Sequence, residues 1–433
     1  MVFKLDTAGN QTVLHTFESN PDGANPNGNL IRDTAGKLYG TAGGGGTLNF
    51  GVVYALDATG KETMLYSFAS APRGSTPFTG VIRSDDGDLY GAAFDGGIDD
   101  WGVVYKLDAQ GKQTVLYTFT GGADGGFPGS VIRDDEGNLY GTAGNGGNLS
   151  DCNGSGCGVV YKLDPWGNQT VLYRFTGMAD GAVPYGGLVR DAAGNLYGTA
   201  GGGAANWGVV YKVSPAGQET VLYTFTGGLD GGLPFGSLVR DSAGNLYGTA
   251  TFGGAGTGFP AGVIFKLDPS GHETVLHNFQ CYDPTNGCQP HAGLVRDEAG
   301  NLYGTTFFGG GPLDAGVVFK LDPTGTFTVL HTFTCGAGAP STCGADGGNP
   351  YDGVIRDSAG NLYGTTSAGG NASQGIAYKL DPAGNETVLH SFTGRADGGQ
   401  PFSGLIDADG YLYGTAPRGG NNGGGVIFRL PTQ

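Results

Sequence analysis

The sequence predicts an all-β fold, specifically an eight-bladed β-propeller with four-stranded blades, built as a single domain over residues 1–433. Three observations support this prediction. A unit of about 50 residues recurs along the whole chain. Each unit contains four short runs of apolar, β-branched and aromatic residues, which is the strand content of a propeller blade. Sustained helical periodicity with capping residues is absent from the sequence.

The repeat is easiest to follow in the segment "GVVYKLD". This segment or a variant begins at Gly51, Gly102, Gly158, Gly208, Gly262, Gly316, Gly375 and Gly425, and a shortened copy, "VFKLD", starts at residue 2. The "TVLY" or "TVLH" run, including the variant "TMLY" at 63–66, and the "LYGT" or "LYGA" run each occur eight times, so we expect eight blades. The ring can close if the strand at 425–430 pairs with the "TVLHTF" run at 12–17. This strand occurs nine times, one more than eight blades need. The sequence leaves open which copy is displaced from the ring and whether it pairs with another molecule.

The order of strands within a blade follows from residue size. In one unit we expect strands at residues 236–241, 245–250, 262–268 and 274–279, from the axis to the rim. Small residues precede "LVRD", which suits the crowded axis. The connections "RDSAGN" and "LDPAGNE" then share one face and carry the Asp, Gly and Asn of tight turns. Calcium loops need alternating acidic ligands, which these turns lack, so we expect no cofactor and keep a structural calcium ion only as a secondary hypothesis.

Composition and charge exclude several classes of partner. The 89 glycines are regularly spaced between apolar runs, which indicates turns rather than disorder. Acidic residues outnumber basic ones by 39 to 22, and the net charge is −17. Nucleic acids and anionic membranes need a basic face, so we expect neither as a partner. The sequence has no run of 18 apolar residues, so we expect no membrane insertion.

The six cysteines fall into three close pairs. They are Cys152 with Cys157, Cys281 with Cys288, and Cys335 with Cys343. Each pair brackets a loop of small and polar residues, without the spacing of a zinc site, so we expect three disulfides and no metal. Disulfides favour an extracellular or cell-surface location. No export signal precedes Met1, and we expect the signal and any anchor to be missing from this sequence.

The repeat as a whole resembles a known family. Its pattern, "DG(x)2P…G(L/V)(I/V)RD(x)AGNLYGT…GG…GVV(Y/F)KLDPxGxxTVLYxFTG", is similar to the GloVer tandem repeat of exported bacterial proteins. The resemblance covers essentially the whole chain. It implies export and a propeller-like ring, and it implies no particular reaction.

The face opposite the tight turns carries the long, variable connections, and function usually lies on such loops. One of these connections is the motif written "FTGGADGGFP" at 119–128, which has an acidic residue in six units: Asp22, Asp124, Asp180, Asp230, Asp346 and Asp397. Arg73 and Asn286 stand there in the other two. Asp followed by Gly is typical of a turn. The alternatives are a ring of ligand-binding carboxylates or a metal site.

Aromatic residues are the other candidates for ligand binding. After the Pro of this motif come Asn27, Phe78, Gly129, Tyr185, Phe235, His291, Tyr351 and Phe402. Side chains at this position should stand near the mouth of the central channel, so we predict that Phe78, Tyr185, Phe235, Tyr351 and Phe402 bind ligand. Trp101 and Trp207 end two of the other loops, where they either pack between blades or stack on a sugar.

A catalytic set is harder to find. Nucleophile elbows, phosphate loops and HExxH motifs are absent from the sequence. Of the six histidines, His291 alone is expected at the channel mouth, with Arg73 as a possible neighbour. Asp95, Asp99 and Asp100 could supply an acid and a base for glycoside cleavage.

These features lead to three hypotheses of function. The first is an exported, monomeric, non-catalytic propeller that binds a polysaccharide or another cell-surface partner on its loop face. The second is a hydrolase or lyase that cleaves polysaccharides at the channel mouth. The third is a scaffold or filament subunit joined through the spare terminal strand.

Overall fold

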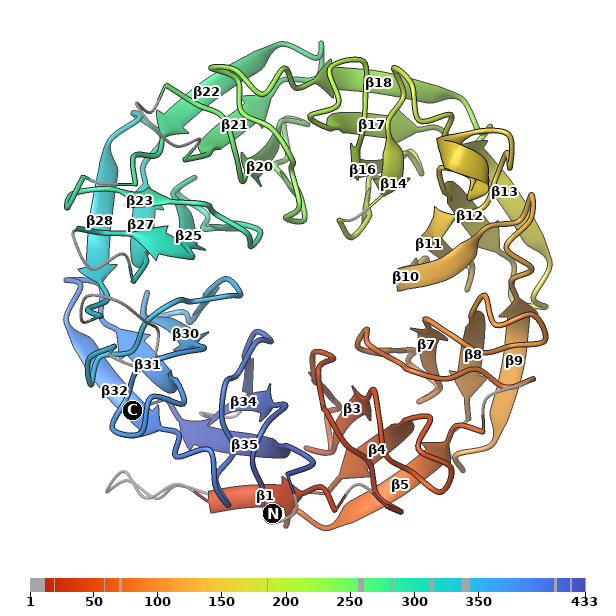
Figure 1. The fold of residues 1–433 in the computed structure, drawn as a ribbon, viewed down its shortest axis with the longest axis horizontal. Helices are drawn as coiled ribbons and strands as arrows, with labels where there is room; N and C mark the ends of the chain where they lie inside the picture. Colours follow the sequence, from red (N-terminus) through yellow and green to blue (C-terminus); the bar gives the residue numbers. More distant parts are fainter. Residues whose placement is uncertain are drawn as a thin grey trace.

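A computed structural model shows a ring of eight antiparallel four-stranded sheets around a central axis (Figure 1). It describes residues 12–18, 20–57, 59–69, 72–108, 110–184, 186–255, 261–281, 283–311, 315–335, 343–408, 411–420 and 423–432. The predicted eight-bladed propeller is therefore confirmed. The predicted strand order is confirmed as well, because each sheet runs from the "LVRD" strand through "LYGT" and "VVYK" to "TVLY".

The strands of the eight blades have the following bounds, from axis to rim. Blade 1 contains β2 (Ile31–Arg32), β3 (Leu38–Ala42), β4 (Val52–Leu56) and β5 (Glu62–Ser67). Blade 2 contains β6 (Ile82–Arg83), β7 (Leu89–Ala93), β8 (Val103–Leu107) and β9 (Gln113–Thr118). Blade 3 contains β10 (Gly126–Arg133), β11 (Leu139–Asn145), β12 (Val159–Leu163) and β13 (Gln169–Arg174). Blade 4 contains β15 (Val189–Arg190), β16 (Leu196–Gly201), β17 (Val209–Val213) and β18 (Glu219–Thr224), with the short β14 (Ala182–Pro184) beside β16.

The second half of the ring repeats the pattern. Blade 5 contains β19 (Val239–Arg240), β20 (Leu246–Ala250), β21 (Val263–Leu267) and β22 (Glu273–Asn278). Blade 6 contains β24 (Val295–Arg296), β25 (Leu302–Thr306), β27 (Val317–Leu321) and β28 (Phe327–Thr332), and β23 (Gly287–Cys288) pairs with β26 (Phe308–Gly309) above it. Blade 7 contains β29 (Ile355–Arg356), β30 (Leu362–Thr366), β31 (Ile376–Leu380) and β32 (Glu386–Ser391). Blade 8 contains β33 (Ile406–Ala408), β34 (Tyr411–Ala416), β35 (Val426–Pro431) and β1 (Thr12–Thr16).

The two ends of the chain close the ring in blade 8. Strand β1 forms the rim of this blade and pairs with β35, with Val13 opposite Phe428. The predicted closure is thus confirmed (Figure 1). The shortened "VFKL" copy at the N-terminus lies outside the described residues.

The core lies between neighbouring blades, where one aromatic pair recurs eight times. The Phe that follows each rim strand packs against the ring of the "VVY" or "VVF" strand of the next blade. In three examples, Phe68 contacts Tyr105, Phe119 contacts Tyr161 and Phe225 contacts Phe265, with ring centroids 5.1–5.2 Å apart. Edge-to-face geometry of this kind adds to the free energy gained by burial, so these pairs hold successive blades together.

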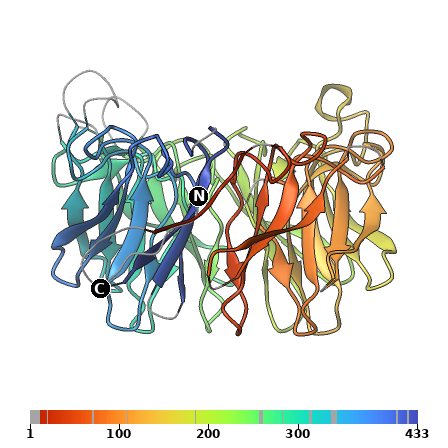
Figure 2. The same ribbon diagram turned by 90° about the horizontal axis from the view of Figure 1, so that it is seen from below.

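The two faces of the ring differ as predicted (Figure 2). The tight turns lie on one face, and the long connections, including the 3-10 turn η1 (Cys152–Gly154), lie on the other, which we call the loop face. In a representative tight turn, Oδ1 of Asp241 accepts the backbone N–H of Asn245 at 2.8 Å and Oδ2 accepts the hydroxyl of Tyr247 at 3.1 Å. These carboxylates serve the turn itself. No described residues form a group of three or more His, Cys, Asp or Glu side chains that could hold a metal ion.

Candidate functional site

The loop-face motif of each blade is a structured crossing from a rim strand to the next inner strand. In blade 3, Oδ2 of Asp124 accepts the backbone N–H of Thr120 at 2.9 Å and the hydroxyl of Tyr117 at 3.0 Å. Asp180 and Asp230 make the same two bonds, and Asp346 and Asp397 accept N–H and hydroxyl groups of Thr334 and Thr393. These carboxylates therefore hold the turn at the rim. Their ligand-binding role stays a prediction.

The partner of this acidic residue is the Tyr or His seven positions earlier. His15 lies 3.0 Å from Asp22, and His390 lies 3.2 Å from Asp397. Where the acid is replaced, the pairing persists, because Asn286 bonds His277 at 3.0 Å. These three histidines thus each have a structural partner in the crossing.

Trp101 and Trp207 pack on the glycines of the next crossing. A Cβ atom on Gly121 would overlap the indole of Trp101, and one on Gly227 would overlap that of Trp207. Disulfides occupy the same place elsewhere, because Cys152–Cys157 lies against Gly177 and Cys335–Cys343 lies against Gly348. The geometry supports the packing interpretation of both tryptophans, and their sugar-binding role stays a prediction.

The backbone before each motif Pro is held in the left-handed region, which sequence reasoning did not anticipate. Thr76, Phe127 and Leu233 have φ of 58°, 57° and 52°. Each donates its N–H to the last loop residue of the neighbouring repeat unit; Phe127, for example, bonds the carbonyl of Trp101 at 2.8 Å. This strained, clamped position fixes the direction in which the next side chains leave the crossing.

Five ring side chains of blades 5 to 8 then gather at the channel mouth. We call Phe235, His291, Phe307, Tyr351 and Phe402 the aromatic arc. The rings of Phe235, His291 and Tyr351 are nearly parallel. The ring centroid of His291 lies 6.5 Å from that of Phe235 and 6.1 Å from that of Tyr351. Phe402 continues the arc at 5.4 Å from Tyr351. Tyr351 is 49% exposed and Phe402 is 36% exposed, so part of the arc faces solvent.

A groove of about 460 Å³ adjoins the arc on blade 7. We call it the amide groove, because Asn349, Gln374 and Gln400 line it together with Phe307, Ser367 and Phe402. The Asn349 side chain donates to the carbonyl of Phe307 at 3.0 Å, which joins the groove to the arc. Charged side chains are absent from its described lining.

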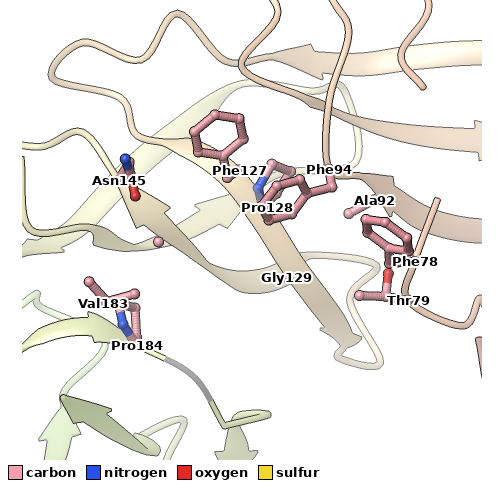
Figure 3. Close-up of a pocket in the computed structure, with 11 residues that line it drawn as sticks. Phe78, Thr79, Ala92, Phe94, Phe127, Pro128, Gly129, Asn145, Val183 and Pro184 are labelled. Carbon is pink, nitrogen blue, oxygen red and sulfur yellow. The ribbon is translucent and has the colours of Figure 1, made fainter. Parts of the chain in front are cut away.

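A second cavity, of about 410 Å³, lies on the loop face between blades 2 and 4 (Figure 3). We call it the phenylalanine pocket, because its main walls are Phe78, Phe94 and Phe127, with Pro128, Val183 and Pro184 beside them. The rings of Phe94 and Phe127 are stacked at 4.8 Å and 18°, and Trp101 contacts Phe127 at 4.8 Å. Only Thr79 and Asn145 contribute polar side chains to the described lining.

A family match decides what kind of chain this is. The Gloeobacter/Verrucomicrobia repeat matches residues 1–154, 149–345 and 339–433. The chain belongs to the Gloeobacter/Verrucomicrobia repeat family. Three disulfides, Cys152–Cys157, Cys281–Cys288 and Cys335–Cys343, suggest for this family member the oxidising environment of exported proteins.

Other comparisons found only distant likenesses to this repeat-family protein. No curated protein matches the chain. Among solved structures, a gluconolactonase of Xanthomonas campestris is 15% identical over 67% of this chain and 84% of its own, with a TM-score of 0.36. A GH74 enzyme of Niastella koreensis is 20% identical over 81% of this chain and 51% of its own, with a TM-score of 0.47. PorZ, a surface component of the type-IX secretion system of Porphyromonas gingivalis, is 14% identical over 91% and 51%, also with a TM-score of 0.47. Likeness at this level carries no information about ligand or reaction.

The residues proposed for catalysis do not form one site in this family member. His291 belongs to blade 6 and is surrounded by the rings of Phe235, Phe307 and Tyr351; burial lowers its pKa. Arg73, in the crossing that leads into blade 2, donates to the hydroxyl of Tyr66 on the rim strand β5 of blade 1, at 3.4 Å. Blade 2 lies across the ring from blade 6 (Figure 1).

The three candidate carboxylates of blade 2 also lie apart from His291. Oδ1 of Asp100 accepts the N–H of Gly96 at 2.8 Å, so this residue shapes its own loop. Asp99 is exposed, and the pKa of Asp95 is raised by burial and by the neighbouring Asp100. Tyr185, the remaining predicted aromatic, lies outside the described residues. No helix in the described part of the chain is long and apolar enough to cross a membrane.

Sequence reasoning missed a set of carboxyl pairs between blades. Glu62, Glu219, Glu273 and Glu386 each begin a rim strand, and burial raises the pKa of each to about 7. A crossing-motif carboxylate adds to the shift; for Glu219 it is Asp180. Blades 2 and 3 carry Gln113 and Gln169 at this position. This exchange of Glu for Gln between blades was the signal in the sequence that could have indicated the pairs.

Proposed function

We propose that this protein is an exported, non-catalytic propeller that binds a neutral polysaccharide on its loop face, along the aromatic arc and the amide groove. The observation that carries the proposal is the series of near-parallel rings Phe235, His291 and Tyr351 beside a groove lined by amide side chains. Sugars present a flat apolar face and a hydroxyl-rich edge. Aromatic rings stack on the apolar face. Amide side chains suit the hydroxyl edge, because an amide both donates and accepts hydrogen bonds.

The arrangement of the arc favours a chain over a single sugar. Its rings come from successive blades, so the aromatic surface extends around the channel mouth instead of forming one closed pocket. The amide groove begins where Phe402 ends the arc. A linear polysaccharide could therefore stack on several rings and place one residue among the amides.

Charge favours a neutral polymer. The protein has a net charge of −17, so an acidic polysaccharide would be repelled at low ionic strength. The described lining of the groove offers no cationic side chain to offset that repulsion. Recognition would depend on stacking and on neutral hydrogen bonds, and it should therefore depend little on salt.

Retention of the protein on an array of neutral and acidic polysaccharides tests the proposal. Tyr351→Ala removes the most exposed ring of the arc and should weaken binding about tenfold, the equivalent of about 1.4 kcal/mol. Trp166→Ala is the matched control, because Trp166 is 84% exposed and lies in a tight turn on the opposite face. The proposal fails if no polysaccharide is retained, or if both variants weaken binding equally.

A further inference from the structure

We propose that the phenylalanine pocket is a second binding site, and that it takes an uncharged aryl group. This site lies beyond the proposed polysaccharide site, because it occupies blades 2 to 4 whereas the arc and groove occupy blades 5 to 8. The repeat is broken in blade 3, beside this pocket.

Blade 3 lacks the rings that other blades place at the channel mouth. Gly129 follows the motif Pro, where Phe78, Phe235 and Phe402 stand in other blades. Gly144 follows the "LYGTA" strand, where blades 2 and 6 carry Phe94 and Phe307. Both glycines line the pocket, so the cavity occupies the space of two rings: one after the motif Pro, which most blades carry, and one after the "LYGT" strand, which blades 2 and 6 carry.

The backbone does not require these two glycines. Neither has a positive φ, in contrast to most glycines of the loops. A Cβ atom on Gly144 would meet its nearest neighbour, Cγ1 of Val183, at 3.7 Å, which is ordinary contact. A Cβ atom on Gly129 would lie 3.4 Å from Oγ1 of Thr142. The effect of both glycines is to leave room.

Blade 3 is also one residue shorter between the motif Pro and the inner strand. Its inner strand β10 therefore runs unbroken over eight residues, whereas β6 and β19 have two. This continuous strand carries Phe127 and Pro128 along one wall of the pocket (Figure 3). The break in the repeat thus creates both the space and its wall.

The lining selects an aromatic ligand. Phe94 and Phe127 form a flat wall of stacked rings, and Phe78 presents an edge-to-face contact to Phe94 at 6.1 Å. A further ring can stack on such a wall or meet it edge-on. The volume of about 410 Å³ exceeds the roughly 150 Å³ cavity known to hold benzene, so a ring with a substituent fits.

The same lining disfavours sugars and anions. Burying several hydroxyl groups without hydrogen-bond partners is unfavourable, and Thr79 and Asn145 are the polar side chains that the described lining offers. The net charge of −17 also disfavours an anionic aryl compound. Phe78 and Phe94 are 47% and 39% exposed, so the pocket is open to a ligand from the loop face.

Saturation-transfer NMR with simple probes tests this assignment. The probes are benzyl alcohol, phenyl β-glucoside, methyl β-glucoside and cyclohexanol, each titrated against the full chain. We expect benzyl alcohol and phenyl glucoside to bind at least tenfold more tightly than the two probes without an aryl ring. Binding of phenyl glucoside but not of benzyl alcohol would assign the aryl group to a glycan substituent; binding of both would assign it to free aryl compounds as well.

Two variants and one control locate the binding. Gly144→Phe restores the ring present in blades 2 and 6 and should fill the pocket, while Phe94→Ser removes one wall; each should weaken aryl binding at least tenfold. Phe402→Ser is the matched control, because Phe402 is 36% exposed, close to the 39% of Phe94, but lines the amide groove. It should impair polysaccharide retention and leave aryl binding unchanged. The proposal is wrong if no aryl probe binds, if methyl glucoside binds as well as phenyl glucoside, or if Gly144→Phe with an unchanged melting temperature still binds the aryl probes.

Discussion

Replacing Glu219 by Gln should stabilise the propeller, and more so at pH 8 than at pH 5. Glu219 faces Asp180 between blades 3 and 4, and its Oε1 atom is buried without a hydrogen-bond partner among the described residues. At the equivalent position of blade 3, Nε2 of Gln169 donates to the carbonyl of Asp124 at 2.8 Å. The substitution therefore replaces an unpaired acceptor by a donor that the chain already uses elsewhere.

The sign of the pH dependence follows from the pKa of Glu219, which burial and Asp180 raise from 4.5 to about 7 in the folded protein. Between these two pH values the folded protein binds more protons than the unfolded chain, so stability falls as the pH rises through this window. The full shift would correspond to about 3 kcal/mol. Solvent screening of a half-buried pair reduces this to about 1 kcal/mol, and the new hydrogen bond adds about 1 kcal/mol.

Differential scanning calorimetry at pH 5 and pH 8 measures the effect. We expect Glu219→Gln to raise the melting temperature by about 2 °C at pH 8 and by about half of that at pH 5, given the entropy of unfolding of a chain of this size. Gln169→Glu is the reciprocal control and should lower the melting temperature at pH 8 more than at pH 5. Equal shifts at both pH values, or a destabilising Glu219→Gln, would refute the reasoning.

Three further predictions concern packing. Tyr105→Phe should leave stability unchanged or raise it by up to about 1 kcal/mol, because its buried hydroxyl has no partner among the described residues and Phe265 fills the same position in blade 5; chemical unfolding checks this. Gly121→Ala should lower the free energy of unfolding by about 3 kcal/mol, because the new Cβ atom overlaps Trp101. Gly154→Ala, also at positive φ but in open space, should lower it by about 1 kcal/mol. Equal melting temperatures of the two variants would contradict the packing role of the indole. Replacing both Cys152 and Cys157 by Ala should cost about 2 kcal/mol in urea unfolding, and no change would show that the bridge is dispensable.

The architecture was accessible from the sequence because the repeat reports it eight times. Counting "TVLY" and "LYGT" runs predicts eight blades and the closing pair of β1 with β35, and both are confirmed. The disulfide pairs were predictable from their short spacing. The pairing of Tyr117 with Asp124 was also visible in principle, because a Tyr or His stands seven positions before the acidic residue in blade after blade.

The site was harder to predict because its contacts join different repeats. The arc depends on His291 and Tyr351, which are 60 positions apart in the chain, and their ring orientation follows from strained backbone that no residue pattern announces. The carboxyl pair of Glu219 and Asp180 likewise crosses a blade boundary. The missing residue after Pro128 was readable as a departure from the repeat, but its consequence, a cavity, depends on which side chains surround the missing ring.

The central claim is that a neutral polysaccharide binds at the mouth of the loop face. Its most direct test is a crystal structure of the protein with a neutral oligosaccharide drawn from the best-retained polymer on the array. We predict sugar rings stacked on Tyr351 and Phe402, with hydroxyl groups bonded to the amides of Asn349, Gln374 or Gln400. An oligosaccharide bound on the tight-turn face, or at the rim away from the aromatic arc, would contradict the account.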